Sequence, residues 1–169
     1  MTNETNKTLE NDTINYTLEI LTHKTVPFKY PVAESERKQI PSKFILCGED
    51  DKDDEDLVKE IFSSVDESFS LHFVNNGRKL VATLEQLPDD GLPCLLVLDY
   101  NMPELNGAEI LKELKKINRY DSIPKIIWST SGAEMYKQLC LNLGAADYVI
   151  KPSNVNDLQQ IVRYMISHC

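Results

Sequence analysis

Four short apolar runs, each with a polar side chain at or just beyond its end, constrain the fold of this chain most strongly. The runs cover residues 44–47, 94–98, 126–128 and 148–150, and the polar residues are Glu49 with Asp50, Asp99, Ser129 and Lys151. Short, continuous apolar runs are typical of strands that are buried on both faces of a parallel sheet. Such sheets bind ligands at the carboxyl ends of their strands. We therefore expect these acid, hydroxyl and amine groups to meet at one sheet edge.

From Lys43 onward, strand-like runs alternate with stretches of helical periodicity. A further strand is expected at residues 71–74, and helices are expected around residues 57–65, 80–87, 106–117, 135–143 and 158–166. Helical spacing places Ile117 on the buried stripe of the third helix, and Met135 and Leu139 on the apolar face of the fourth. Asn106 and Glu109 form a capping-box pattern at the start of the third helix. Gly144 is expected to end the fourth helix in a left-handed conformation. Five strand–helix units predict an α/β fold, with a five-stranded parallel sheet wound on both faces by helices.

Residues 1–42 differ from the rest of the chain. Residues 1–13 are polar and are expected to be disordered, whereas residues 14–20 fit either a strand or a weak helix face. Three prolines, at positions 27, 31 and 41, impose extended chain on the remainder of this segment. We therefore divide the sequence into an N-terminal arm, residues 1–42, that packs on the domain or on a partner, and one globular domain, residues 43–169.

Charge and composition exclude several classes of function. The formal net charge of −9 argues against binding to a nucleic-acid backbone, which needs Lys and Arg to replace counterions. No run is long and apolar enough to span a membrane, and the N-terminus lacks an apolar signal region. The four cysteines, Cys47, Cys94, Cys140 and Cys169, form no C-x-x-C pair. They predict reduced core thiols of a cytoplasmic protein and no disulfide.

The polar residues at the strand ends suit phosphoryl chemistry with a divalent metal. Asp99 ends the central apolar run, and a carboxylate there can attack phosphorus to form an aspartyl phosphate. Glu49, Asp50 and Asp99 offer the oxygen ligands that Mg²⁺ prefers. Lys151 and Ser129 can hold the phosphoryl oxygens. Glu49 to Asp56 contains seven acids in eight residues, and for Asp53 to Asp56 a solvated helix start remains an equal alternative.

Residues 43–169 resemble the receiver domain of the bacterial two-component response regulators. The supporting stretches are Phe44–Asp51, Leu98–Pro103 with Asn106-Gly107, Ile123-Pro124 leading into Trp128–Ser131, and Gly144–Pro152. The run from Asp50 to Asp54 is further similar to single-domain receivers of the phytochrome-associated type. The resemblance implies a flavodoxin-like fold with strand order 2-1-3-4-5.

The resemblance also implies a role for each site residue. Asp99 would be the phosphoacceptor, with Asp50 a direct Mg²⁺ ligand, Glu49 a ligand through water, and Asn101 a ligand through its backbone carbonyl. Lys151 would pair with the phosphoryl group, and its bond to Pro152 is expected to be cis.

Two further pairs of residues receive roles from the same resemblance. Ser129, in place of a more usual threonine, would be the switch hydroxyl, and Tyr148 the aromatic that changes rotamer with it. Asn101 and Ser131 occupy the positions that tune self-dephosphorylation. Gly48 stands where an apolar residue is common, and we expect it to loosen the end of the first strand.

The resulting hypothesis is a single-domain receiver, not an enzyme. A histidine kinase or a histidine phosphotransfer protein would donate the phosphoryl group, and a downstream protein would bind the face formed by helix 4, strand 5 and helix 5. Tyr148, Tyr164 and the apolar side of helix 5 suit either a phosphorylation-dependent homodimer or packing within a monomer, and both stay open. A phosphorylation-independent binding module is the alternative. A haloacid-dehalogenase-type phosphatase is disfavoured, because the position of its second acid holds Asn101, which cannot do general acid work.

Overall fold

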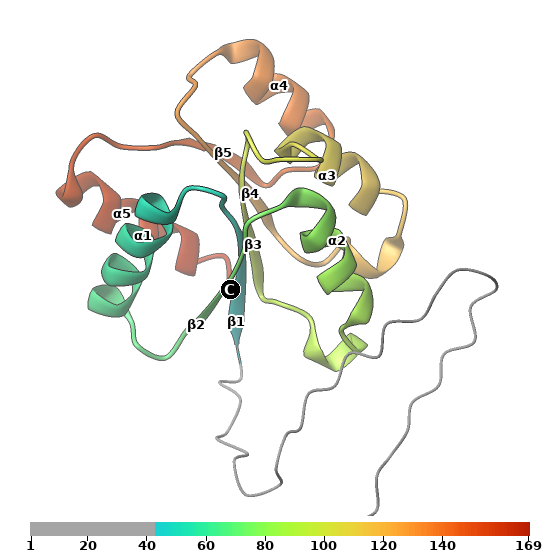
Figure 1. Ribbon diagram of the computed structural model, residues 1–169, viewed down its shortest axis with the longest axis horizontal. Helices are drawn as coiled ribbons and strands as arrows, with labels where there is room; N and C mark the ends of the chain where they lie inside the picture. Colours follow the sequence, from blue (N-terminus) through green and yellow to red (C-terminus); the bar gives the residue numbers. More distant parts are fainter. Residues whose placement is uncertain (1–42) are drawn as a thin grey trace, which may run out of the picture. The chain divides into compact units, whose positions relative to one another are not determined.

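The computed structural model describes residues 43–169, and our predictions for the N-terminal arm lie outside this part (Figure 1). Strands and helices alternate along the described chain. The strands are β1 (Phe44–Gly48), β2 (Ser70–Val74), β3 (Leu95–Asp99), β4 (Lys125–Ser129) and β5 (Asp147–Ile150). The helices are α1 (Lys52–Val65), α2 (Gly77–Gln86), α3 (Gly107–Leu114), α4 (Glu134–Asn142) and α5 (Val155–Ile166), with short 3₁₀ turns η2 (Asp89–Gly91) and η3 (Asn118–Tyr120).

The five strands form one parallel sheet in the order β2-β1-β3-β4-β5, as the resemblance implied. β1 pairs with β2 and β3, and β3 pairs with β4 so that Asp99 lies opposite Trp128. β4 then pairs with β5, with Ser129 opposite Ile150. This register brings the ends of β3, β4 and β5 to the same level of the sheet.

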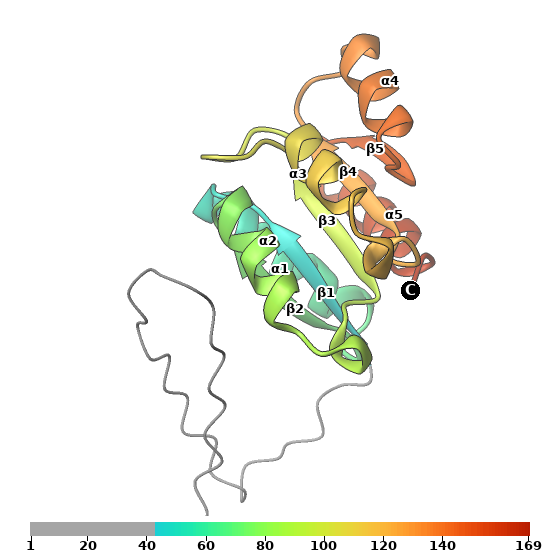
Figure 2. The same cartoon turned by 90° about the vertical axis from the view of Figure 1, so that its right-hand side faces the viewer.

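Helices cover both faces of the sheet, and each face has its own apolar core (Figure 2). Side chains from α1 and α5, including Phe62 and Leu158, pack with Ile45 of β1 on one face. Side chains from α2, α3 and α4, including Leu80 and Ile110, pack on the other face. Burial on both faces explains why these strands read as continuous apolar runs.

Local signals in the sequence set several helix ends. Asn106 and Glu109 form the expected capping box at the start of α3, and Gly144 after α4 has φ +100°. Ile117, expected on the buried stripe of the third helix, is instead exposed, because α3 ends at Leu114. Within residues 43–169, no helix combines the length and the apolar character needed to cross a membrane.

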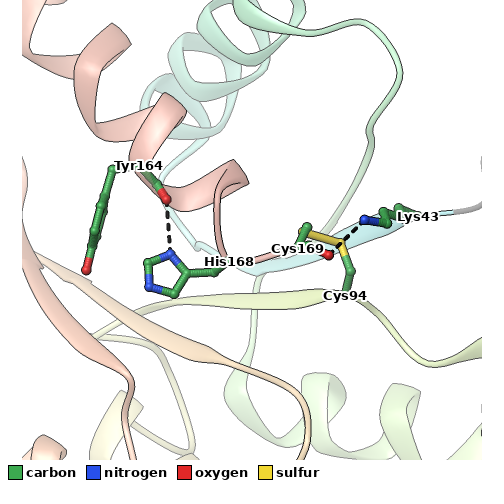
Figure 3. The surroundings of a disulfide bond; sticks show 5 residues. All are labelled: Lys43, Cys94, Tyr164, His168 and Cys169. Carbon is green, nitrogen blue, oxygen red and sulfur yellow. Dashed lines mark hydrogen bonds between the residues drawn. A yellow bond between two sulfur atoms is a disulfide. The ribbon is translucent and has the colours of Figure 1, made fainter.

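Two of the four cysteines form a disulfide, so the prediction of four reduced thiols was wrong. Cys94 precedes β3 and Cys169 follows α5, and their Cα atoms lie 5.0 Å apart although 75 residues separate them (Figure 3). Lys43 lies in the same cluster and donates a hydrogen bond to the backbone oxygen of Cys169 at 2.8 Å. Cys47 and Cys140 are free and buried, as expected. No local spacing in the sequence signals this pair, because the docking of α5 on the sheet creates the proximity.

Candidate functional site

The structure brings the predicted polar residues together at the carboxyl edge of the sheet. Glu49 follows β1, Asp99 and Ser129 are the last residues of β3 and β4, and Lys151 follows β5. Glu49, Asp99 and Ser129 are buried, although each is polar or charged. Buried polar groups are costly unless they are paired, so this concentration marks a site that is built for a purpose other than packing.

Glu49, Asp50 and Asp99 form a cluster of carboxylates. Their ligand oxygens all lie within 4.8 Å of one another, and only Asp50 of the three is exposed. The backbone N–H of Asn101 donates to Asp99 Oδ2 at 2.8 Å, which places the start of the β3–α3 loop directly beside the cluster. A set of oxygen donors with one side open to water fits a hard divalent cation such as Mg²⁺.

Lys151 is the cation that faces these acids. Its Nζ donates to Glu49 Oε2 at 2.8 Å and to Asp54 Oδ2 at 2.7 Å, and it lies 3.1 Å from Asp99 Oδ1. Burial by itself lowers the pKa of Lys151, but the hydrogen bonds to Asp54 and Glu49 and the charge of Asp99 outweigh it, so that the pKa is raised overall. Lys151 is therefore held as an ammonium group throughout the physiological range.

The surroundings of Glu49 have opposing effects on its pKa. Burial raises the pKa of Glu49, the hydrogen bond and charge of Lys151 lower it, and the nearby charge of Asp99 raises it again, leaving it raised overall. The backbone N–H of Asp51 donates to Glu49 Oε1 at 3.2 Å and also favours the ionised form. A divalent cation would add a further stabilising charge for this carboxylate.

Ser129 and Tyr148 are linked through Ser131. The Ser129 side chain is fully buried, and its Oγ accepts a hydrogen bond from the Ser131 N–H at 3.1 Å. Tyr148 is also buried and donates its hydroxyl proton to the Ser131 backbone oxygen at 2.8 Å. The two residues that the resemblance marks as switch residues thus bind the N–H and the backbone oxygen of the same residue, Ser131.

The loop between β3 and α3 packs closely on its neighbours. Met102 lies where a side chain at Gly48 would project, with its Sδ 2.8 Å from the position a Cβ would take. Gly48 stays paired with Val74 and Leu98 in the sheet, so the strand end that we expected to be loose is filled by Met102. At the start of α2, Gly77 N–H donates to the Pro103 backbone oxygen at 3.2 Å.

Replacing Gly77 with alanine is expected to destabilise the protein by about 1–3 kcal/mol, as overpacking does. A Cβ at Gly77 would lie 2.0 Å from the backbone oxygen of Leu105, which cannot move aside as a flexible side chain can. Gly48→Ala is the comparison, because the atoms it would meet are the side-chain ends of Met102 and Leu80. Urea unfolding should show the larger loss for Gly77→Ala, and equal losses would contradict this account.

Sequence reasoning missed one residue of the site and misjudged one bond. Asp54, left undecided as part of a solvated helix start, contacts Lys151. The signal for Asp54 in the sequence was its place in the first turn of α1, directly after the acids at the end of β1.

The Lys151–Pro152 bond is trans, contrary to expectation. The trans form is the favoured isomer, and Lys151 N–H donates to the Ser129 backbone oxygen at 2.7 Å in this arrangement.

Exposed apolar residues lie on α4, β5 and α5. These residues, with their exposed fractions, are Met135 (70%), Leu139 (43%), Ile150 (51%), Val155 (51%) and Tyr164 (42%). Helical spacing placed Met135 and Leu139 on the apolar face of the fourth helix, but the structure leaves both exposed. We call these five residues the α4-β5-α5 surface.

Comparison with known proteins identifies relatives of this chain. The family model described as response regulator receiver domain matches residues 45–163. The chain is 34% identical over 122 residues to the transcriptional regulatory protein CpxR of Klebsiella pneumoniae, covering 72% of the chain but only 48% of CpxR. It is 29% identical over 117 residues to the two-component response regulator ORR5 of Oryza sativa, covering 69% of the chain and 84% of ORR5.

Solved structures give the same relationship. The phosphorylated cyanobacterial phytochrome response regulator RcpA matches with a TM-score of 0.67 and 29% identity, over 75% of this chain and 96% of RcpA. The Mn²⁺-bound form of the response regulator Rcp1 matches with a TM-score of 0.64 and 32% identity, over 74% of this chain and 92% of Rcp1.

Proposed function

Because the chain belongs to the response regulator receiver family, we propose that it accepts a phosphoryl group on Asp99 and signals through a change of shape. One observation carries this proposal. Asp99 lies within a cluster of three carboxylates and 3.1 Å from the ammonium of Lys151. This arrangement places a nucleophile, an oxygen-rich cation site and a fixed positive charge within reach of one phosphoryl group.

In the proposed reaction, an Asp99 carboxylate oxygen attacks phosphorus and forms a new P–O bond. The bond from phosphorus to the donor breaks, and the leaving group departs with the electron pair. The donor would be a phosphohistidine of a histidine kinase or of a histidine phosphotransfer protein. Phosphoryl transfer depends mainly on positioning and on neutralising charge. The N–H of Asn101 holds Asp99 Oδ2, and Lys151 faces Oδ1.

We propose Mg²⁺ as the cofactor, held by Glu49, Asp50 and Asp99 with the Asn101 backbone carbonyl. The acidic cluster has the donor chemistry for this ion, and the solved relative Rcp1 has a Mn²⁺-bound form. When bound, the ion would neutralise charge on the phosphoryl oxygens and on the crowded carboxylates. We propose that Asn101 and Ser131, at the positions that the resemblance implies, set how long the phosphoryl group persists before water removes it.

The output is proposed to pass through the α4-β5-α5 surface. Once Asp99 carries a phosphoryl group, Ser129 would donate its hydroxyl proton to it, and the Ser131 contact that joins Ser129 to Tyr148 would rearrange. The exposed Met135 and Ile150 follow Ser131 by four residues and Tyr148 by two, and a downstream protein or a second copy of this chain would cover them. We propose a cytoplasmic protein that acts on a protein partner and not on nucleic acid, in keeping with its net charge of −9.

The proposal predicts a covalent adduct that depends on Asp99 and on Mg²⁺. Incubation of the full chain with acetyl phosphate and Mg²⁺ should add one phosphoryl group, detected by intact-mass measurement, with acetate as the leaving group. Asp99→Asn keeps the shape of the side chain but lacks the nucleophilic carboxylate, so it should show no adduct.

Two controls test whether the adduct depends on the site and on Mg²⁺. Asp121→Asn alters an exposed acid away from the site and should leave the adduct unchanged. Omission of Mg²⁺ should prevent it. An adduct that survives in Asp99→Asn would place the acceptor elsewhere. A wild-type chain that gives no adduct and binds no beryllofluoride would instead favour a phosphorylation-independent binding module.

A further inference from the structure

We propose that Asp54 is a positioning residue that competes with the phosphoryl group for Lys151 and thereby weakens the phosphorylated state. This inference rests on the proposed function, since it concerns the same ammonium group. Asp54 Oδ2 makes the shortest of the three carboxylate contacts of Lys151, at 2.7 Å, against 2.8 Å for Glu49 and 3.1 Å for Asp99.

The start of α1 fixes Asp54 in this position. Asp51 caps the helix, and its Oδ1 accepts from the Asp53 N–H at 2.8 Å and from the Asp54 N–H at 3.3 Å. The neighbouring acids Glu55 and Asp56 pair with Lys52, which lies on the same helix. The first turn of α1 thus sends Asp54 toward the sheet edge, while the acids that come after it are paired along the helix.

Lys151 has too few protons to satisfy both sets of acceptors. An ammonium group has three N–H donors, and two of them already go to Glu49 and Asp54, with Asp99 facing the third side. A phosphoryl group on Asp99 brings further anionic oxygens that need the same donors. Only the donor that faces Asp99 is available to the phosphoryl group, so any second hydrogen bond from Lys151 to that group requires Glu49 or Asp54 to give up its own.

Differences in burial select Asp54 as the carboxylate that yields. The side chains of Glu49 and Asp99 are 5% and 7% exposed, whereas that of Asp54 is 39% exposed. A released Asp54 can be solvated by water, but a released Glu49 could not be. Asp54 also lies outside the Glu49–Asp50–Asp99 cluster that is proposed to hold the metal. Its contact with Lys151 therefore opposes phosphoryl binding without contributing a metal ligand.

Removing the Asp54 charge should strengthen binding of a phosphoryl mimic. Asp54→Asn takes away one negative charge and leaves only a neutral amide oxygen as a competing acceptor, so we expect beryllofluoride at saturating Mg²⁺ to bind about three- to fivefold more tightly, the range of one partly exposed ion pair. The reporter is the fluorescence of Trp128, the single tryptophan of the chain, which lies opposite Asp99 in the sheet. Mg²⁺ binding alone should change less than about twofold, as expected if Asp54 is not a metal ligand.

Asp53→Asn is the matched control, because Asp53 lies in the same helix turn, carries the same charge and is exposed. Asp53→Asn should leave the dissociation constant for beryllofluoride close to that of the wild type. Equal tightening in both variants would reveal a general charge effect and overturn the specific role of Asp54. Unchanged or weaker binding of beryllofluoride by Asp54→Asn would also overturn the role of Asp54, even if the melting temperature of the variant fell. A wild-type chain that shows neither saturable beryllofluoride binding nor a phosphoryl adduct would overturn the proposed function and this inference with it.

Discussion

Replacing Lys151 with methionine is expected to destabilise the metal-free protein by about 3–5 kcal/mol at pH 7, because a buried ion pair that loses one partner leaves an uncompensated charge. Two of the three carboxylates on Lys151 are deeply buried, with side-chain exposures of 5% for Glu49 and 7% for Asp99. Methionine keeps the length and the apolar stem of the side chain, so the loss reports on charge and hydrogen bonds. Urea unfolding in the presence of a chelator measures it.

The loss should depend on pH and on Mg²⁺. The pKa of Glu49 is already raised by burial, and Lys151 is its main opposing influence. A carboxyl group whose pKa is raised by folding lowers the free energy of unfolding when it is ionised. This loss is absent below the unfolded pKa of about 4.3 and is complete once the pH has risen through the folded pKa. Without Lys151 the folded pKa of Glu49 rises further, so the difference in unfolding free energy between variant and wild type should narrow as the pH falls below 7.

Lys112→Met is the matched control, since Lys112 is an exposed lysine on α3. It should change the free energy of unfolding by less than about 0.5 kcal/mol, as surface substitutions usually do. Mg²⁺ should recover part of the loss in Lys151→Met, because a bound cation replaces some of the missing positive charge. A Lys151→Met protein as stable as wild type at pH 7 would show that the acids are not buried against Lys151 in solution.

Breaking the Cys94–Cys169 disulfide is expected to destabilise the protein by about 4 kcal/mol. The bond closes a loop of 75 residues, and a cross-link of that span removes much of the freedom of the unfolded chain. For a domain of this size, such a loss lowers the melting temperature on the order of 10–20 °C. Thermal unfolding of the oxidised protein with and without dithiothreitol should show this difference.

Cys169→Ser provides the control for the disulfide. The variant should melt at the temperature of the reduced wild type, and dithiothreitol should not lower it further. Thiol titration of the unfolded, unreduced wild-type protein should find two thiols, those of Cys47 and Cys140. Four thiols in a protein purified without reductant, or a melting temperature insensitive to dithiothreitol, would contradict the bond.

Much of the fold could be predicted from the sequence, because its signals are local. The apolar runs at 44–47 and 94–98 lie within a residue or two of β1 and β3. The capping box at Asn106 depends on a spacing of three residues, and Gly144 depends on its own backbone conformation. The strand order came from the resemblance, and the sheet confirms it.

Helical spacing alone was a weaker guide to burial. Met135 and Leu139 fit the apolar face of an amphipathic helix, yet both are exposed on α4. Periodicity predicts that a helix has an apolar face but does not say whether another layer covers it. The packing of α4 against the sheet leaves part of this face in contact with solvent.

The candidate site also has a part that could be predicted from the sequence and a part that could not. Its strand-end residues, Glu49, Asp99 and Lys151, could be assigned to one edge from the order of residues alone, because each comes at the end of a strand in a parallel sheet. The contact of Asp54 with Lys151 spans 97 residues of chain and the Cys94–Cys169 bond spans 75, and both became visible only in the folded molecule. Apolar runs and capping residues are patterns of residues only a few positions apart, which a sequence displays directly. Contacts between distant segments depend on how α1 and α5 dock on the sheet, and that docking is set by the packing of the whole core.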